Sequence, residues 1–153
     1  MKQQQYSQLI SQAKSLVSGE QDLIANMANI SALLFNGLED VNWAGFYLYK
    51  DEQLVLGPFQ GQPACIRIPM GKGVCGTSAS TQTDQRIDDV HGFDGHIACD
   101  AASNSEIVVP IVVNNALIGV LDIDSPNHAR FTQDDEDGLV EIANILIESQ
   151  QAL

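Results

Sequence analysis

The sequence predicts an α+β fold, with a central antiparallel sheet and helices from both ends of the chain packed on one face of it. Apolar residues recur at helical spacing near both termini. Between them lie short runs rich in aromatic and β-branched residues, with the period-two alternation of strands and with turn residues at their ends. The 153 residues are enough for one domain with its own core, so we expect a single domain over 1–153.

Two helices are predicted at the N-terminus, over 2–17 and 20–38, separated at Ser18 and Gly19. The second has one apolar stripe. We expect both helices to cover the sheet. The stripe consists of Leu23, Met27, Ile30, Leu33, Leu34 and Leu38.

The middle of the chain predicts hairpins and one long loop. The loop, over 90–105, has few apolar residues, and loops of that length in compact domains are commonly functional. Asn114 and Asn115 suit a tight hairpin turn, because asparagine tolerates a positive φ angle. The predicted strands are 43–49, 53–59, 65–68, 86–88, 106–113 and 116–124, with a short helix over 73–80.

The last predicted helix begins after Thr132, which can cap it, and runs to the C-terminus. Asp134, Asp135 and Glu136 suit its first turn, where the helix dipole favours negative charge. With the sheet's other face free of these helices, we expect the loops there to form a ligand pocket.

Charge and composition exclude several classes of partner. Twenty acidic residues against seven basic ones give a net charge of −13, which repels nucleic acid and anionic membrane surfaces. No apolar run approaches the roughly 20 residues of a membrane span, and the polar N-terminus lacks a signal-peptide core. We therefore expect a cytoplasmic protein that binds neither nucleic acid nor membrane.

Three cysteines, Cys65, Cys75 and Cys99, all lie within 65–99. An odd number in a chain of this size does not suggest a framework of structural disulfides. Cys65 and Cys75 are equally consistent with small buried core residues. Cys99 lies in a polar loop next to Asp100, where a role in the core is less natural. The stretch is therefore interpreted as a redox site, in which Cys75 also lies in the first turn of a short helix, a setting that lowers a thiol pKa.

Carboxylates provide the second set of candidate residues. Asp122 and Asp124 lie on one face of a strongly apolar strand. The alternative is a solvated strand end, since Ser125 and Pro126 follow at once. Straight pairing from the turn places Glu106 on the opposite face, whereas a bulge near Pro110 would rotate Glu106 onto the face of the two aspartates. Three clustered acids would raise at least one carboxyl pKa and could hold a substrate ammonium group.

Aromatic residues and two weaker motifs complete the candidates. Trp43 and Tyr47 share a strand face and are consistent with either a substrate wall or ordinary core. Gly71, Gly73 and Gly76 match a dinucleotide-binding pattern, but the residues that follow are too polar for a crossover helix. A zinc site including His91, His96 and Cys99 has weak spacing and no C-x-x-C pair. We expect no cofactor and no metal, and we expect the histidines to shape the loop.

The segments NWAGFYLY, LGPFQGQPACIRIPMGKGVCG, DVHGFDGHIACD, SEIVVPI and GVLDIDSP closely resemble the free methionine-(R)-sulfoxide reductases, which have the GAF fold. The chain departs from the family at Asp94, where proline is usual. The resemblance implies that Cys99 attacks the sulfoxide, that Cys65 or Cys75 resolves the product as a disulfide, and that Trp43 packs against the S-methyl group. Glu106 and Asp124 would join the catalytic set, and Asp122 would bind substrate.

The same resemblance implies free methionine-(R)-sulfoxide as substrate, a thioredoxin-like reductant, a role in oxidative stress and a homodimer. The alternative is a non-enzymatic GAF domain that senses a small molecule or redox state. Turnover of methionine sulfoxide with a dithiol separates the two.

Overall fold

The computed structural model describes residues 2–95 and 102–151. The helices in this part of the chain are α1 (Lys2–Val17), α2 (Leu23–Gly37), α3 (Gly73–Thr81), the 3-10 helix η1 (Val90–Gly92) and α4 (Gln133–Gln151). The strands are β1 (Trp43–Lys50), β2 (Gln53–Gly61), β3 (Arg67–Pro69), β4 (Gln85–Ile87), β5 (Ser105–Val113) and β6 (Ala116–Ser125).

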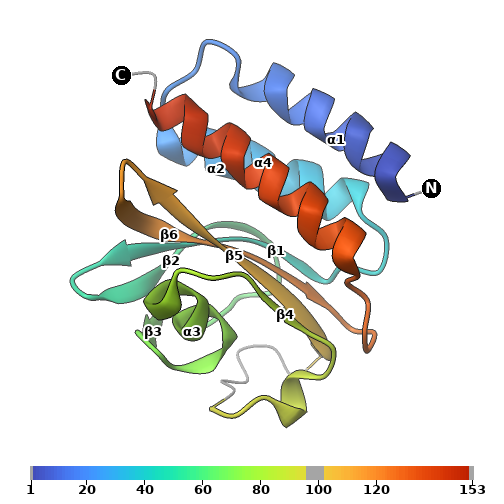
Figure 1. The fold of residues 1–153 in the computed structure, drawn as a ribbon, viewed down its shortest axis with the longest axis vertical. Coiled ribbons are helices and arrows are strands. Elements are labelled where there is room, and N and C mark those ends of the chain that lie inside the picture. Colours follow the sequence, from blue (N-terminus) through green and yellow to red (C-terminus); the bar gives the residue numbers. More distant parts are fainter. Residues whose placement is uncertain (1, 96–101, 152–153) are drawn as a thin grey trace.

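The strands form one antiparallel sheet in the order β3-β2-β1-β6-β5-β4. Helices α2 and α4 pack on one face of the sheet, and the short α3 packs on the other (Figure 1). The α+β prediction and the placement of terminal helices on one face are confirmed. Helix α1 differs from the expectation, because it forms an outer layer and packs mainly on α2 and α4 (Figure 1).

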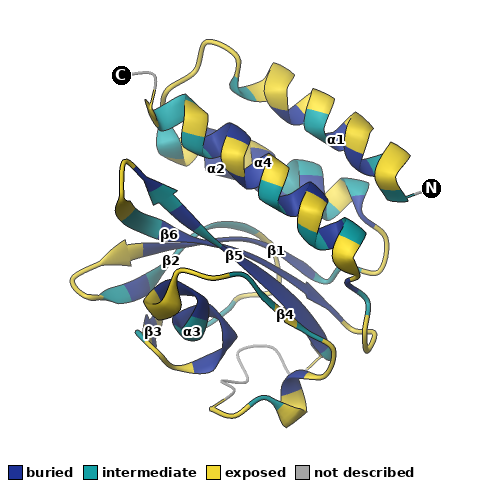
Figure 2. Ribbon diagram, in the orientation of Figure 1, coloured by how far each residue is buried: buried dark blue, intermediate teal, exposed yellow. Residues whose placement is uncertain are grey.

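The alternation of residues along the central strands divides the interior into two parts. On β1, Ala44, Phe46 and Leu48 face the helices and join the larger apolar core. Trp43 and Tyr47 point to the opposite face and join a smaller cluster with α3. Figure 2 shows the consequence as dark, buried strands between the helix layer and α3. The predicted faces of the first strand are therefore confirmed.

Capping interactions set the first residues of helices α2 and α4. Helix α2 begins at Leu23, later than predicted, because Asp22 is its N-cap and its carboxylate accepts a hydrogen bond from the Ala25 N–H. At α4 the Thr132 carbonyl accepts from Glu136, while Asp135 accepts the Thr132 N–H at 2.8 Å. That second contact is half of a capping box, in which the third helical residue reaches back to the cap.

The β5–β6 hairpin decides where the acidic residues lie. Asn114 and Asn115 have φ angles of 50° and 67°, as the turn prediction requires. The register shifts by one residue between Ile111 and Val112, with Ile118 as the extra residue in β6. The predicted bulge therefore exists, but at a different place, because Pro110 pairs in register with Val120.

Among the described helices, none combines the length and the apolar character that crossing a membrane requires.

Candidate active site

The candidate site begins with a row of side chains that crosses three strands. Trp43 of β1 lies opposite Asp124 of β6, and Asp124 lies opposite Glu106 of β5. Asp122, two residues before Asp124, lies on the same face and opposite Val108. Of the two alternatives for Glu106, the structure has the one in which all three acids share a face, and the β6 bulge produces it.

Helix α3 adds a thiol to this row. Cys75 is in its first turn, as predicted, and its Sγ donates a hydrogen bond to Glu106 Oε2 over 3.7 Å. One ligand atom from each of Cys75, Glu106 and Asp122 lies within 4.8 Å of the other two. A short helix with a buried, small-residue face therefore brings sulfur against two carboxyl groups.

All three carboxyl groups are buried. Glu106 is 8% exposed, Asp122 4% and Asp124 9%. Within the described part of the chain, Oδ1 of Asp122 accepts no hydrogen bond. A buried acceptor without a partner is costly, so this oxygen indicates a place where a ligand can donate.

Burial also changes the acidity of these groups. It raises the pKa of Glu106 well above its ordinary value, and the charge of Asp122 adds to that increase. Burial is also the largest cause of the raised pKa of Asp122, and the charge of Asp124 raises that pKa further. The expected rise in a carboxyl pKa is therefore confirmed, and the cluster holds a proton to higher pH than an exposed carboxyl group does.

The expectation for Cys75 is wrong in sign. Burial raises the pKa of its thiol well above the usual value, and the charges of Asp122, Glu106 and Asp124 raise it further. Three neighbouring acids and desolvation outweigh any lowering by the first turn of α3. Cys75 is consequently a thiol rather than a thiolate in this environment.

Three aromatic rings form a wall beside the acids. Trp43 stacks on Phe59 with ring centroids 5.1 Å apart and on Tyr47 at 5.8 Å. The Trp43 indole N–H donates to the Gln62 carbonyl. Phe59 is not among the site residues predicted from the sequence. Gly45 was the available signal, because a Cβ there would approach the Cβ of Phe59 to 2.3 Å, so only glycine leaves room for this ring.

Cys65 lies beside the aromatic wall, half buried between β2 and β3. The Tyr47 hydroxyl donates to its carbonyl oxygen over 3.1 Å. Cys75 is a free thiol, whereas Cys65 is disulfide-bonded. Cys99 and His96 lie outside the described residues.

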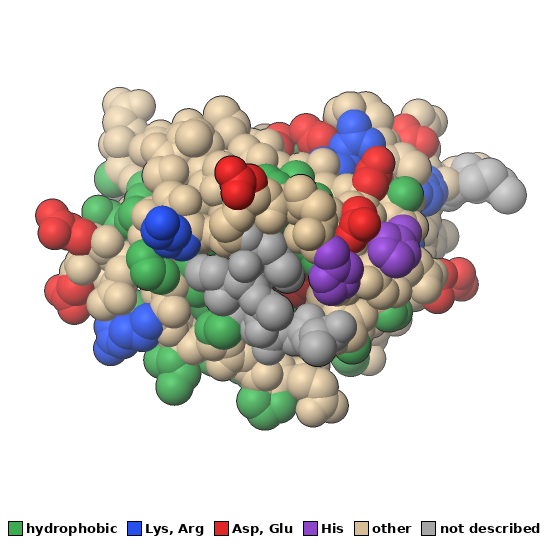
Figure 3. Space-filling view, turned by 90° about the horizontal axis from the view of Figure 1, so that it is seen from below, with side chains coloured by type: hydrophobic (Ala, Val, Ile, Leu, Met, Phe, Trp, Pro, Cys, Tyr) green, Lys and Arg blue, Asp and Glu red, His purple; other side chains and the backbone are tan. Residues whose placement is uncertain are grey.

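The described histidines lie at the edge of this region. His91 Nε2 and Asn104 Oδ1 are 2.9 Å apart, and His128 lies 3.7 Å from Asp89. Figure 3 shows the histidines in purple at one side of the face that α3 and its neighbouring loops form. His91 contacts the loop residue Asn104, and its role in shaping the loop stays a prediction.

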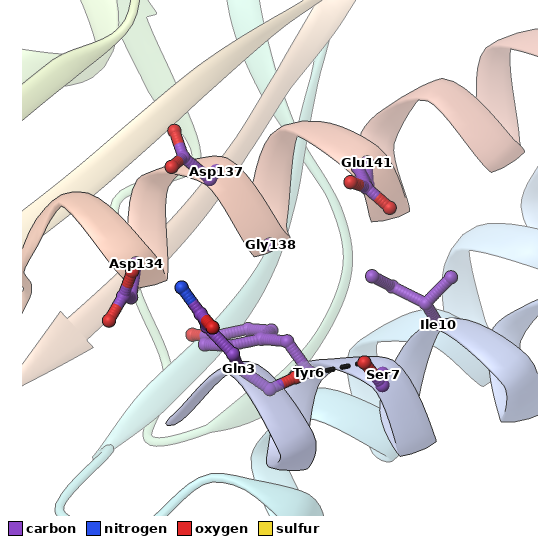
Figure 4. A pocket seen from close by; sticks show the side chains of 8 residues that line it. All are labelled: Gln3, Tyr6, Ser7, Ile10, Asp134, Asp137, Gly138 and Glu141. Atoms are coloured by element: carbon purple, nitrogen blue, oxygen red, sulfur yellow. Dashed lines mark hydrogen bonds between the residues drawn. The ribbon is translucent and has the colours of Figure 1, made fainter. Parts of the chain in front are cut away.

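A hollow of about 290 Å³ lies between α1 and α4 (Figure 4). None of the described site residues lines it, so it is separate from the candidate site. Its lining is Gln3, Tyr6, Ser7, Ile10, Asp134, Asp137, Gly138 and Glu141.

Comparison with known proteins identifies the family of this chain. The GAF domain family matches residues 22–147. The free methionine-R-sulfoxide reductase of Escherichia coli K12 is 61% identical over 134 residues, which are 88% of this chain and 81% of that protein. The chain belongs to the free methionine-(R)-sulfoxide reductase family.

Solved structures agree with this membership. The substrate complex of the Staphylococcus aureus fRMsr is 51% identical, covers 95% of each chain and has a TM-score of 0.91. A Burkholderia vietnamiensis structure named as a GAF sensor protein is 52% identical, with a TM-score of 0.96 over 100% of this chain and 99% of that one. The GAF fold inferred from sequence resemblance is therefore correct.

In this member of the reductase family, seven of the eight predicted site residues are described, and the fold brings them to one side of the sheet. They are Trp43, Tyr47, Cys65, Cys75, Glu106, Asp122 and Asp124.

Proposed function

We propose that this protein reduces free methionine-(R)-sulfoxide to methionine with electrons from thiols. The observation that carries the proposal is the pairing of three buried carboxyl groups with an aromatic wall on the same sheet face. The acids suit a substrate ammonium group, which a free amino acid has and a peptide-bound residue lacks. The indole of Trp43 suits the S-methyl group.

The reaction balances with two cysteine thiols. A thiolate attacks the sulfoxide sulfur, the oxygen takes up a proton, and methionine leaves as the attacking cysteine becomes a sulfenic acid. A second thiol then attacks that sulfenic sulfur, and water departs as the disulfide forms. Methionine sulfoxide gains two electrons and the two cysteines lose two.

The carboxyl cluster supplies the proton in this scheme. Burial keeps the pKa of Glu106 and of Asp122 above ordinary values, so the cluster retains a proton near neutral pH. Glu106 and Asp124 are the catalytic acids we propose, and Asp122 orients the ammonium group through its free oxygen. An acid that stays protonated in a dry pocket can protonate a sulfoxide oxygen without a solvent path.

We assign the attack to Cys99 and the resolution to Cys65. Cys75 is buried among carboxyl groups that raise its pKa, which opposes a thiolate there. The disulfide-bonded state of Cys65 supports its role as the resolving residue. A thioredoxin-like protein would then reduce the disulfide in the cytoplasm.

A stereospecific turnover assay tests the function. The reduced protein should convert free methionine-(R)-sulfoxide to methionine with a dithiol, and should leave the S epimer and a peptide-bound sulfoxide unchanged. Cys99→Ser should release no methionine even in a single turnover, while Cys65→Ser should release one equivalent and stop. Activity on the peptide but not on the free amino acid would exclude this substrate.

The alternative function is that of a sensor, because the chain is similar to a protein named as a GAF sensor. A sensor would bind methionine sulfoxide or another small molecule without releasing methionine. Binding without any product in the presence of dithiol would favour the sensor over the enzyme.

We also propose that the protein is a homodimer. The first two helices carry exposed apolar side chains, with Leu16 41% and Ile24 51% exposed. Burying such side chains against a second copy would stabilise association. Sedimentation equilibrium at micromolar concentration should give twice the chain mass, and a monomer throughout would contradict the proposal.

A further inference from the structure

The cluster of Cys75, Glu106 and Asp122 has the chemistry of a metal site as well as that of a substrate pocket. It combines one sulfur with two carboxyl groups, and all three residues are buried. Among the described residues, Oδ1 of Asp122, one of the two carboxylate oxygens of this cluster residue, is buried and has no hydrogen-bond partner. A cation that binds this oxygen gives it a partner. The oxygen is already removed from water in the folded protein, so binding adds no further desolvation cost for it.

The distances fit a small tetrahedral ion. Bonds of about 2.3 Å to sulfur and about 2.0 Å to oxygen place tetrahedral S and O ligands roughly 3.5 Å apart. Cys75 Sγ and Glu106 Oε2 are 3.7 Å apart, and ligand atoms of all three residues lie within 4.8 Å of one another. Modest side-chain rotation would complete the site, without a change in the strands or in α3.

We propose that Cys75, Glu106 and Asp122 bind a thiophilic divalent cation, of which Zn²⁺ is the type. The three residues leave a fourth tetrahedral position for water, as in zinc sites with three protein ligands. On binding, the Cys75 S–H bond gives way to an S–metal bond and its proton passes to solvent, with no change of oxidation state.

Sulfur selects the class of metal. Mg²⁺ and Ca²⁺ prefer all-oxygen ligand sets, whereas thiolate favours Zn²⁺ and related ions. Three anionic ligands and one divalent ion have a net charge of about −1, whereas the same three ligands without the ion have a net charge of about −3. Ionisation of all three groups is therefore much less costly when a cation is bound between them than when the site is empty.

The site has a consequence for activity that rests on the proposed function. The metal would use the same Asp122 oxygen and the same carboxyl cluster that the substrate ammonium group needs. Bound Zn²⁺ and methionine sulfoxide should therefore exclude each other, and Zn²⁺ should be a competitive inhibitor.

Cobalt titration tests metal binding without any turnover. Co²⁺ added to protein reduced with a non-thiol phosphine should produce a thiolate-to-cobalt charge-transfer band and the strong visible bands of a tetrahedral ion. Both should saturate at one equivalent per chain, and Zn²⁺ should then remove them, since it binds such ligands more tightly than Co²⁺. No charge-transfer band in the reduced protein would overturn the proposal.

Variants assign the ligands. Cys75→Ser should abolish the charge-transfer band, and Asp122→Asn should weaken Zn²⁺ binding by at least about tenfold. Glu148→Gln is the charge-matched control, because Glu148 is exposed on α4 and its loss should leave binding unchanged. Cys65→Ser should keep the band. Loss of the band in Cys65→Ser with its retention in Cys75→Ser would place the metal elsewhere and refute the site. Circular dichroism checks that each variant is folded.

Competition separates this proposal from the proposed function. Free methionine sulfoxide should displace Co²⁺ from the single-turnover-inactive Cys99→Ser variant, with loss of both bands. If metal binds as described but substrate never displaces it, the metal site stands and the substrate assignment for this pocket fails. If the reduced protein turns over sulfoxide but binds no metal, the function stands and the metal site fails.

Discussion

Two buried acidic centres in this protein show opposite electrostatics. Asp135 at the start of α4 is 1% exposed and has a partner for each oxygen. It accepts hydrogen bonds from Lys2 at 2.6 Å, from the Tyr6 hydroxyl at 2.8 Å and from Arg130 at 3.2 Å. The acids of the candidate site contact one another and a thiol, and Oδ1 of Asp122 has no hydrogen bond from any described residue.

The acidity of the two centres differs accordingly. Burial alone would raise the pKa of Asp135, but hydrogen bonds from Lys2, Thr132 and Tyr6 outweigh it and lower the pKa below its ordinary value of 3.8. At Glu106 and Asp122 burial raises the pKa and neighbouring acids raise it further. A buried acid that is paired with cationic side chains of the same protein stabilises the fold. A buried acid without such partners can bind a ligand instead.

The largest effect should come from the site acids. Asp124→Asn or Glu106→Gln should each lose about 2 to 4 kcal/mol of transition-state stabilisation, roughly 30- to 1,000-fold in kcat/KM. Their stability should be unchanged or higher, because an amide removes the cost of a crowded buried acid. Steady-state kinetics and urea unfolding measure the two quantities.

The double variant gives the control for this first prediction. The effects of Asp124→Asn and Glu106→Gln on kcat/KM should fall short of their sum if the two groups share a proton. Near-normal activity in both single variants would show that the proton comes from another group.

Asp135→Asn should have the reverse pattern. It leaves Arg130, whose side chain is 11% exposed, without its carboxylate and weakens the cap of α4, so the free energy of unfolding should fall by on the order of 2 kcal/mol. The partial exposure of Lys2 limits its share. The kcat/KM of the folded protein should not change. Loss of activity with unchanged stability would reverse the roles of the two centres.

The pH dependence of stability should separate the centres in one measurement. Glu106 and Asp122 have raised folded pKa values, so their destabilisation is relieved as pH falls from those values toward 4.5 and 3.8, respectively. Asp135 has a lowered folded pKa, so its contribution is present above 3.8 and is lost as pH falls below that value. Stability should therefore rise on mild acidification and then fall, by about 1.4 kcal/mol per unit of pKa shift.

Matched variants identify each limb of this profile. Glu106→Gln should flatten the rise on mild acidification, while Asp135→Asn should flatten the fall at lower pH. Urea midpoints across the acid range measure both. A profile that neither substitution alters would mean that other groups control acid stability.

The smallest effect is expected for Tyr6→Phe. It removes one hydrogen bond to Asp135 and should cost about 1 kcal/mol of stability without affecting kcat/KM. Tyr49→Phe is the matched control, because Tyr49 is 37% exposed and its substitution should change stability little. Equal losses of unfolding free energy in the two variants would show that the Tyr6 hydroxyl makes no specific contribution to stability.

Local sequence patterns specify the two faces of β1 and most of the candidate residues. Period two placed Trp43 and Tyr47 together, and the paired asparagines predicted the hairpin turn that the structure has. These features depend on neighbours within a few residues, so local chemistry specifies them. The resemblance then supplied the family, which the comparison with the Escherichia coli protein confirms.

The place where the acids and the thiol meet depends on long-range packing. The one-residue bulge at Ile118 places Glu106 opposite Asp124, and no local pattern distinguished it from a bulge at Pro110. The raised pKa of Cys75 has the same origin, because its causes are burial and carboxylates from two distant strands. Helix position is encoded locally, whereas desolvation and the field of neighbouring charges exist only once α3 packs on β5 and β6.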